Sequence, residues 1–167
     1  NEEVDKKKVN KIMEDVFSRY GVIGAPAIID KIKAFGFKYA TVSGTTWNLD
    51  AVTVPEAKGD LIKTGWSRVE SIGSQFEDGL LSEEEKHNKT IAVWQAIRKE
   101  IEGLLPDTIK KHGSVHDLIT SGARGSMSQL IQLAGMKGIM VNNSGGELEF
   151  PVLGSNIEGF TPLEYFI

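Results

Sequence analysis

Two long apolar stripes joined by a tight turn constrain the fold of this chain more than any other feature. Between residues 56 and 105 apolar residues recur every three or four positions, the spacing of helices that pack as a coiled-coil-like pair. The first stripe comprises Ile62, Trp66, Val69, Ile72 and Phe76, and the second comprises Ile91, Trp94, Ile97, Ile101 and Leu104. Only Asp78-Gly79-Leu80-Leu81 connects them, so the helices must run antiparallel. The sequence therefore predicts a projecting helical hairpin with arms about 30 Å long.

The two arms differ in how strongly their own residues favour a helix. Ser82 and Glu85 form a capping box that gives the second arm its own start. The first arm contains Gly59, Gly65 and Gly73, each of which weakens a helix by up to about 1 kcal/mol relative to Ala. We therefore expect the first arm to depend on tertiary packing or to bend.

A helical base precedes the hairpin. The apolar spacing predicts an amphipathic helix over residues 9–20 with a stop at Gly21, and a second short helix over residues 26–36. From residue 38 to about residue 55 the helical period is lost and Thr, Ser, Gly, Val and Asn become frequent. That segment is expected to be extended or irregular.

Shorter elements follow the hairpin. We expect a short helix or turn over residues 115–120, and a helix that is capped by Ser126 and stops near Gly135. Residues 138–153 are predicted to form a β-hairpin. Ile139, Met140 and Val141 lead into the turn Asn143-Ser144-Gly145-Gly146, and Leu148, Phe150 and Val152 alternate on the return.

The expected fold class is mainly α (α+β). It comprises a helical base with an irregular segment over residues 1–55, the hairpin over 56–105, and a mixed region with the small β-hairpin over 106–167. The chain starts with Asn1 rather than methionine, and a capped helix starts at Thr161 only a few residues before the last one. We expect both ends to continue in a longer protein.

Composition limits the possible functions. The 167 residues carry a net charge of -4, so the chain lacks the broad basic field with which a free-standing nucleic-acid binder attracts phosphates. Without cysteine there is no disulfide framework or cysteine zinc site, and only His87, His112 and His116 supply imidazole. No apolar run approaches the roughly 20 residues that cross a bilayer. We expect a cytoplasmic protein without a membrane segment.

The loop over residues 121–126 is the most suggestive local constellation. Its glycines and the helix that follows can aim backbone N–H groups at an anion, and Arg124 adds a forked positive charge. The alternative is a tight connection whose arginine pairs with a neighbouring carboxylate.

Three other groups favour structural interpretations. His112 and His116 have the spacing of a metal pair on a helix, but Gly113 opposes the helix and no third ligand is evident. The acidic run over residues 83–85 suits the first turn of a helix, where the macrodipole stabilises carboxylates. Trp66 and Trp94 are interpreted as packing residues rather than as stacking platforms for bases.

Two ordered motifs carry a resemblance to a known family. SGARGS over residues 121–126 and QLAGMKGIM over residues 132–140 are similar to a signature, SGARGS then QLAGMRGLM, of the beta-prime (largest) subunits of bacterial RNA polymerases. The end of the chain, from Ser144-Gly145-Gly146 to LEYFI, resembles the approach to that subunit's bridge helix. Further ordered matches are Ser43-Gly44, Asp50, Pro55, Lys58, Asn88-Lys89 and Trp94.

The resemblance implies a place beside the nucleotide entry channel. The hairpin would be the rim helices of the secondary channel, and residues 132–140 would support the bridge helix. Arg124 would bind the incoming nucleoside triphosphate. Asn88 and Lys89 would bind regulators, namely coiled-coil factors of the Gre or DksA type and guanosine tetraphosphate.

The resemblance also implies partners and limits. The partners would be the beta, alpha, omega and sigma subunits of the polymerase. The catalytic magnesium of that family is held elsewhere in the subunit, so this chain is expected to contain no catalytic or metal residue and no cofactor, and to be inactive alone. It departs from the family at Ile131 and Ile157, where arginine is usual, and at His87, where tyrosine is common.

Two other functions remain open from the sequence. The chain could be a free-standing helical-hairpin adaptor for partner proteins, in which residues 121–126 are only a turn. A single-stranded nucleic-acid binder is disfavoured by the acidic composition.

Overall fold

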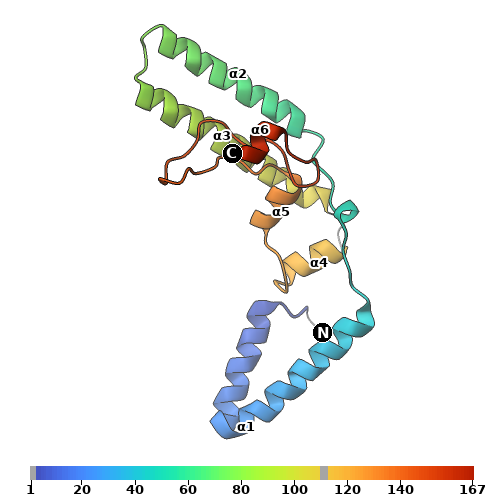
Figure 1. The fold of residues 1–167 in the computed structure, drawn as a ribbon. Helices are drawn as coiled ribbons and strands as arrows, with labels where there is room; N and C mark the ends of the chain where they lie inside the picture. Colours follow the sequence, from blue (N-terminus) through green and yellow to red (C-terminus); the bar gives the residue numbers. More distant parts are fainter. Residues whose placement is uncertain (1–2, 110–112) are drawn as a thin grey trace. The chain divides into compact units, whose positions relative to one another are not determined.

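A computed structural model describes residues 3–109 and 113–167, apart from the side chain of residue 49. The described chain is mainly helical and divides into two compact units (Figure 1). The first unit consists of Asn1–Ala51 and Lys111–Ser126, and the second of Val52–Lys110 and Met127–Ile167. Each unit is therefore built from two separate stretches of the sequence.

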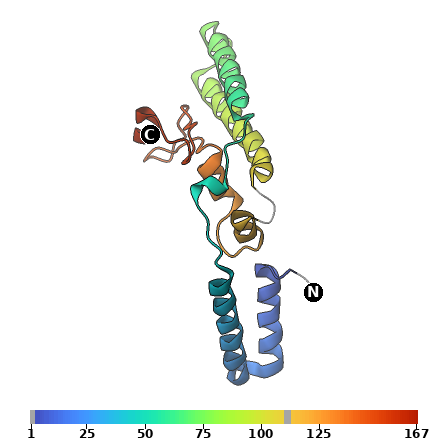
Figure 2. The ribbon, with the colours of Figure 1, turned by 90° about the vertical axis from the view of Figure 1, so that its right-hand side faces the viewer.

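The first unit is dominated by α1, Lys6–Ser43, which Gly21 breaks into two arms. Gly21 has φ 63° and ψ -177°, a conformation open to glycine, and the arms fold back beside each other (Figure 2). The predicted stop at Gly21 is confirmed. The second helix predicted over residues 26–36 is too short at both ends, because the arm after Gly21 already contains Pro26 in its interior and runs on past Gly36 to Ser43. One glycine costs a helix only about 1 kcal/mol, and the rings of Phe35 and Tyr39, 4.5 Å apart, pack across it.

The rest of the first unit is short. A 3-10 turn, η1, spans Leu49–Ala51, and α4 spans Ser114–Thr120, which confirms the short helix expected there. Irregular structure was expected from residue 38, but it begins only after Gly44, the left-handed cap of α1. The backbone N–H of Lys6 donates to the carbonyl of Ser121 at 2.9 Å, which ties the start of α1 to the segment after α4.

The second unit contains the predicted hairpin of α2, Lys58–Glu77, and α3, Glu83–Thr108, which run antiparallel (Figure 1). Its tip is a Schellman turn around Gly79, which has φ 74°. The N–H of Leu80 donates to the carbonyl of Gln75 at 2.9 Å, and that of Gly79 to Phe76 at 3.0 Å. The antiparallel hairpin is confirmed, although α3 extends past its predicted end and includes Pro106.

The core of the second unit lies where α2 and α5 meet α3. Its fully buried members are Trp94, Ile97, Ile101 and Met136. A Cβ on Gly65 would lie 2.7 Å from Cζ3 of Trp94, so only glycine lets α2 approach this closely. Leu105, rather than the predicted Leu104, is fully buried. Gly65 is therefore a packing residue, and the first arm depends on tertiary contacts as expected.

The predicted β-hairpin near the C-terminus is wrong. Within residues 3–109 and 113–167 no strand forms; the segment after α5, Met127–Ala134, turns back through two isolated antiparallel bridges. These pair Gly138 with Val152 and Val141 with Glu147. The Asn142 side chain occupies the turn itself, where its Oδ1 accepts the N–H groups of Ser144 and Gly146 at 2.9 and 2.8 Å. Pairing is thus too sparse to make a ladder.

A buried carboxylate fixes the last helix, α6, Pro162–Phe166. Glu164 is 8% exposed and accepts the backbone N–H groups of Leu153 at 2.7 Å, Gly154 at 2.9 Å and Thr161 at 2.9 Å. Burial works to raise the pKa of Glu164, but the hydrogen bonds from Thr161, Gly154 and Leu153 outweigh it and leave the pKa below its ordinary value. The expected capped start of this helix at Thr161 is confirmed, and the Glu164 carboxylate of its capping box also anchors the backbone of residues 153 and 154.

Replacing Gly65 with Ala should lower the free energy of unfolding by about 1–3 kcal/mol, because the new methyl group would overlap Trp94. Gly73→Ala, in the same helix, is the matched control: a Cβ there meets nothing within 4 Å. That control should stabilise by about 0.5–1 kcal/mol. Urea unfolding followed by circular dichroism measures both, and equal stability of the two variants would contradict this packing.

Replacing Glu164 with Gln should destabilise the fold at pH 7 by about 2 kcal/mol, since a charged acceptor is lost from several hydrogen bonds. A carboxyl whose pKa is lowered on folding contributes stability above its unfolded pKa and loses it as pH falls through the folded pKa. The gap between wild type and variant should therefore close below pH 4.5, the ordinary value. Glu70→Gln, an exposed change on α2, should leave stability within about 0.5 kcal/mol at every pH. A constant gap for Glu164→Gln would contradict the assignment.

Candidate functional site

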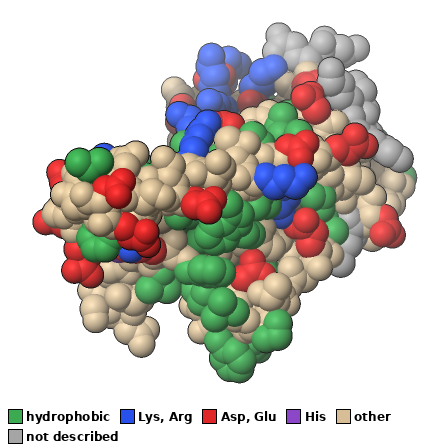
Figure 3. All heavy atoms as spheres, turned by 90° about the horizontal axis from the view of Figure 1, so that it is seen from above, with side chains coloured by type: hydrophobic (Ala, Val, Ile, Leu, Met, Phe, Trp, Pro, Cys, Tyr) green, Lys and Arg blue, Asp and Glu red, His purple; other side chains and the backbone are tan. Residues whose placement is uncertain are grey.

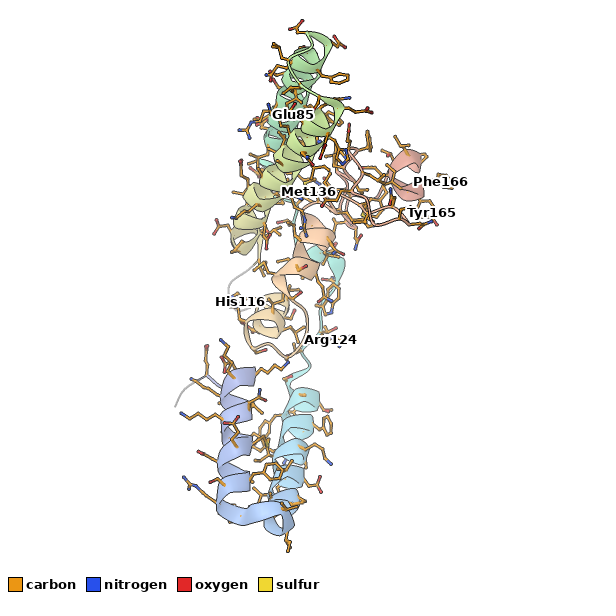
Figure 4. All side chains as sticks on the ribbon, turned by 90° about the vertical axis from the view of Figure 1, so that its left-hand side faces the viewer. Glu85, His116, Arg124, Met136, Tyr165 and Phe166 are labelled. Atoms are coloured by element: carbon orange, nitrogen blue, oxygen red, sulfur yellow. The ribbon has the colours of Figure 1, made fainter. Side chains whose placement is uncertain are left out.

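The start of α3 is built by its cap. The Ser82 hydroxyl accepts the N–H of Glu85 at 3.2 Å, and the Glu85 carboxylate accepts the N–H of Ser82 at 2.8 Å, so the predicted capping box is confirmed. Hydrogen bonds from the Ser82 backbone and hydroxyl, with a smaller contribution from the charge of Lys89, lower the pKa of Glu85. All three acids of residues 83–85 lie in this first turn, as interpreted from the sequence. Figure 4 shows Glu85 on the outer part of the hairpin.

Asn88 and Lys89 lie in the second turn of α3, and both are exposed. They follow Glu85 by three and four positions, so these side chains share one helix face. Lys86 turns instead toward α2, where its Nζ lies 4.9 Å from the centre of the Phe76 ring. The hairpin therefore offers an exposed polar face of one carboxylate, one amide and one ammonium, which we call the rim face (Glu85, Asn88 and Lys89).

His87 connects α3 to a distant segment. Its Nδ1 lies 2.9 Å from Oε1 of Glu149. Further along α3, Nε2 of Gln95 donates to Oε1 of Glu147 at 3.3 Å. Both contacts are partly open to solvent. Sequence reasoning missed them, because alternating residues of the expected β-hairpin gave no signal of which side chains would meet α3. They hold the turn over residues 142–149 against the helix that carries the rim face.

Arg124 lies in the loop over residues 121–126, and its side chain is exposed. Gly122 and Gly125 have φ 71° and 87°, so both sit in the left-handed region that glycine allows. The loop is held by the Arg124 N–H, which donates to the carbonyl of Leu118 at 3.2 Å, and by the Ser121 hydroxyl, which accepts the N–H of Ala123 at 3.3 Å. A fixed backbone with an exposed guanidinium can bind an anion.

Arg124 belongs to the first unit, whereas Asn88 and Lys89 belong to the second. Each unit therefore carries its own candidate surface. α5 begins at Met127, directly after this loop, as the sequence indicated.

The two tryptophans pack as interpreted. Trp94 is 1% exposed, and its ring meets that of Trp66 edge-on at 4.9 Å between centroids. Trp66 remains partly exposed, and the centre of its ring lies 6.1 Å from that of Phe150.

Figure 3 shows hydrophobic side chains gathered on the face seen from above. In the second unit the most exposed apolar residues include Leu80, Leu163, Tyr165 and Phe166.

Metal chemistry finds no support in the part of the chain that the structure describes. No three His, Cys, Asp or Glu side chains gather there in an arrangement that could hold an ion. The histidine pair considered from the sequence includes His112, which lies outside the described residues, while His116 contacts its neighbour Asp117 at 3.1 Å. Among the helices described, none is long and apolar enough to span a bilayer.

Comparison with known families identifies the class of protein. The family model described as RNA polymerase Rpb1, domain 4, matches residues 77–165, which is more than half of the chain and includes α3, α4, α5 and most of α6. The chain belongs to this RNA polymerase family.

Individual relatives extend the match to the whole chain. It is 37% identical over 167 residues to the DNA-directed RNA polymerase subunit beta' of Pelotomaculum thermopropionicum, covering 100% of this chain and 14% of that subunit. The subunit of the same name from Bacillus subtilis is 35% identical over 159 residues, 95% of this chain and 13% of the relative. The subunit of the same name from Treponema pallidum is 35% identical over 171 residues, which cover 100% of this chain and 12% of that relative. The resemblance to beta-prime subunits is confirmed, and the chain spans about 14% of the length of such a relative.

Proposed function

We propose that this chain works in DNA-templated transcription as part of the beta-prime subunit of a DNA-directed RNA polymerase, a nucleotidyltransferase. The observation that carries the proposal is identity at 37% over all 167 residues to a subunit of that name. The catalytic magnesium would be bound by another part of the subunit, so this chain alone would not polymerise nucleotides. Its partners would be the beta, alpha, omega and sigma subunits, in the cytoplasm at the nucleoid.

Within that subunit, α2 and α3 would form the rim of the secondary channel. The length of the hairpin, the capped start of α3 at Ser82 and the polar rim face support this role. Exposed Asn88 and Lys89 would contact coiled-coil factors of the Gre or DksA type, and would contribute to a guanosine tetraphosphate site. Because both are exposed and no core packing depends on them, they can contact a partner without rearrangement of the hairpin.

Arg124 would bind the phosphates of the incoming nucleoside triphosphate. Its exposed guanidinium stands on a loop whose backbone is fixed by hydrogen bonds on both sides. Arginine suits this role because its planar fork donates two parallel hydrogen bonds to phosphate oxygens.

Binding of a purified Gre- or DksA-type factor to this chain tests the rim assignment. We expect the double change Asn88→Ala with Lys89→Ala to weaken binding at least tenfold, because it removes a charge and an amide from the rim face. Lys99→Ala is the matched control, since it removes one exposed ammonium from the same helix about 15 Å away. Equal affinities of the double variant and wild type would contradict the assignment of the rim face as the binding surface.

Nucleotide addition by the polymerase that contains this chain tests Arg124. Arg124→Lys keeps the charge but loses the fork, so we expect the KM for nucleoside triphosphates to rise by about tenfold, and by more in Arg124→Ala. An Arg68→Ala variant, which removes an exposed guanidinium on α2, should leave KM unchanged. An unchanged KM in both Arg124 variants would remove this residue from the substrate site.

A further inference from the structure

Cations gather at one end of the first unit, although the whole chain has a net charge of -4. The first two turns of α1 carry Lys6, Lys7, Lys8 and Lys11, and the adjoining loop carries Arg124, all of them exposed. The carboxylates along the same described stretches, 3–11 and 113–126, are Glu3, Asp5 and Asp117. Five cations against three acids leave a local excess of two positive charges, the opposite sign to the chain.

The structure fixes Lys6 beside the loop that bears Arg124. Their segments are joined by the bond from the Lys6 N–H to the Ser121 carbonyl at 2.9 Å. The stem of Lys6 runs along Gly122, where an added Cβ would lie 3.2 Å from Cβ of Lys6 and 3.8 Å from its Cδ. Gly122 thus leaves room for this stem. Figure 4 shows Arg124 on the loop beside the first turn of α1.

Two of the neighbouring carboxylates are already engaged. Asp5 accepts the N–H of Lys8 at 2.8 Å as the cap of α1, and Asp117 lies 3.1 Å from Nδ1 of His116. The Nζ of Lys8 donates to the carbonyl of Glu3 at 2.7 Å, so this lysine is held by its own segment. Lys6 is therefore the cation that both lies against the loop and remains exposed to a ligand.

We propose that Lys6 and Arg124 together form a binding site for a polyphosphate group, with Lys7 and Lys11 adding long-range attraction. Two cations from separate stretches of sequence can contact different phosphates of one ligand, which a single arginine cannot do. Lys6 contributes a compact ammonium and Arg124 a planar fork, so the pair suits a linear chain of phosphates. This inference rests on the proposed contact of Arg124 with a triphosphate and adds Lys6 as its second cation.

Calorimetric titration of the full chain with inorganic triphosphate tests this site. Lys6→Gln, which keeps an exposed helix-compatible side chain, should raise the Kd at least tenfold, and the wild-type affinity should fall as salt is added. Lys31→Gln is the matched control, because it removes one exposed lysine charge from the other arm of α1. It should change the Kd less than about twofold, the scale expected for one screened, distant charge. Circular dichroism establishes that each variant keeps its helices, and amide shifts of residues 121–126 report where triphosphate binds.

The variants separate this inference from the proposed function. If Arg124→Gln weakens binding and Lys6→Gln does not, the inference fails and the role of Arg124 stands. If Lys6→Gln weakens binding and Arg124→Gln does not, the two-cation site and the proposed role of Arg124 both fail. Absence of triphosphate binding by the wild-type chain, or equal losses in Lys6→Gln and Lys31→Gln, would also overturn the inference.

Discussion

The close approach of α2 to α3 is the contact on which the second unit depends. Gly65 leaves space for the ring of Trp94, which is 1% exposed. Trp94 packs in one buried cluster with Ile97, Ile101 and Met136. A helical hairpin alone has little area to bury, so it gains stability where a third element covers it. Met136, which follows α5, supplies that cover as a member of the same buried cluster. The rim face can therefore be fully polar, because the opposite face of α3 holds the core.

A buried ammonium, Lys58, and a buried carboxylate, Glu164, organise the segment after α5, where regular pairing is sparse. Lys58, 4% exposed, pairs with Glu158, which also accepts the hydroxyl of Ser155 at 2.6 Å. The Glu164 carboxylate accepts a hydrogen bond from the backbone N–H of Leu153. A buried charge is costly unless it is paired, so these contacts fix one arrangement of the loops where a β-ladder is missing.

The first unit has a different balance of forces. Of its described residues only Ala25 and Val115 are buried apolar ones, while large side chains of α1 such as Val22, Ile23 and Phe37 are exposed. Apolar surface of this kind is typical of segments that are covered in an assembly. The chain spans about 14% of the length of a beta-prime relative.

The sequence by itself determined most of the helices and the capped helix starts, because periodicity and caps are local; the ends at Ser43 and Thr108 lie beyond those predicted. The apolar stripes predicted the helical hairpin, and Ser82 and Thr161 predicted two helix starts. The SGARGS motif indicated the RNA polymerase family. Tertiary structure decided what depends on distant partners. It replaced the β-hairpin by isolated bridges, and it brought Glu149 to His87 from 62 positions away. It also placed Lys6 against the Arg124 loop. Such contacts follow from how the elements pack, and no local spacing encodes them.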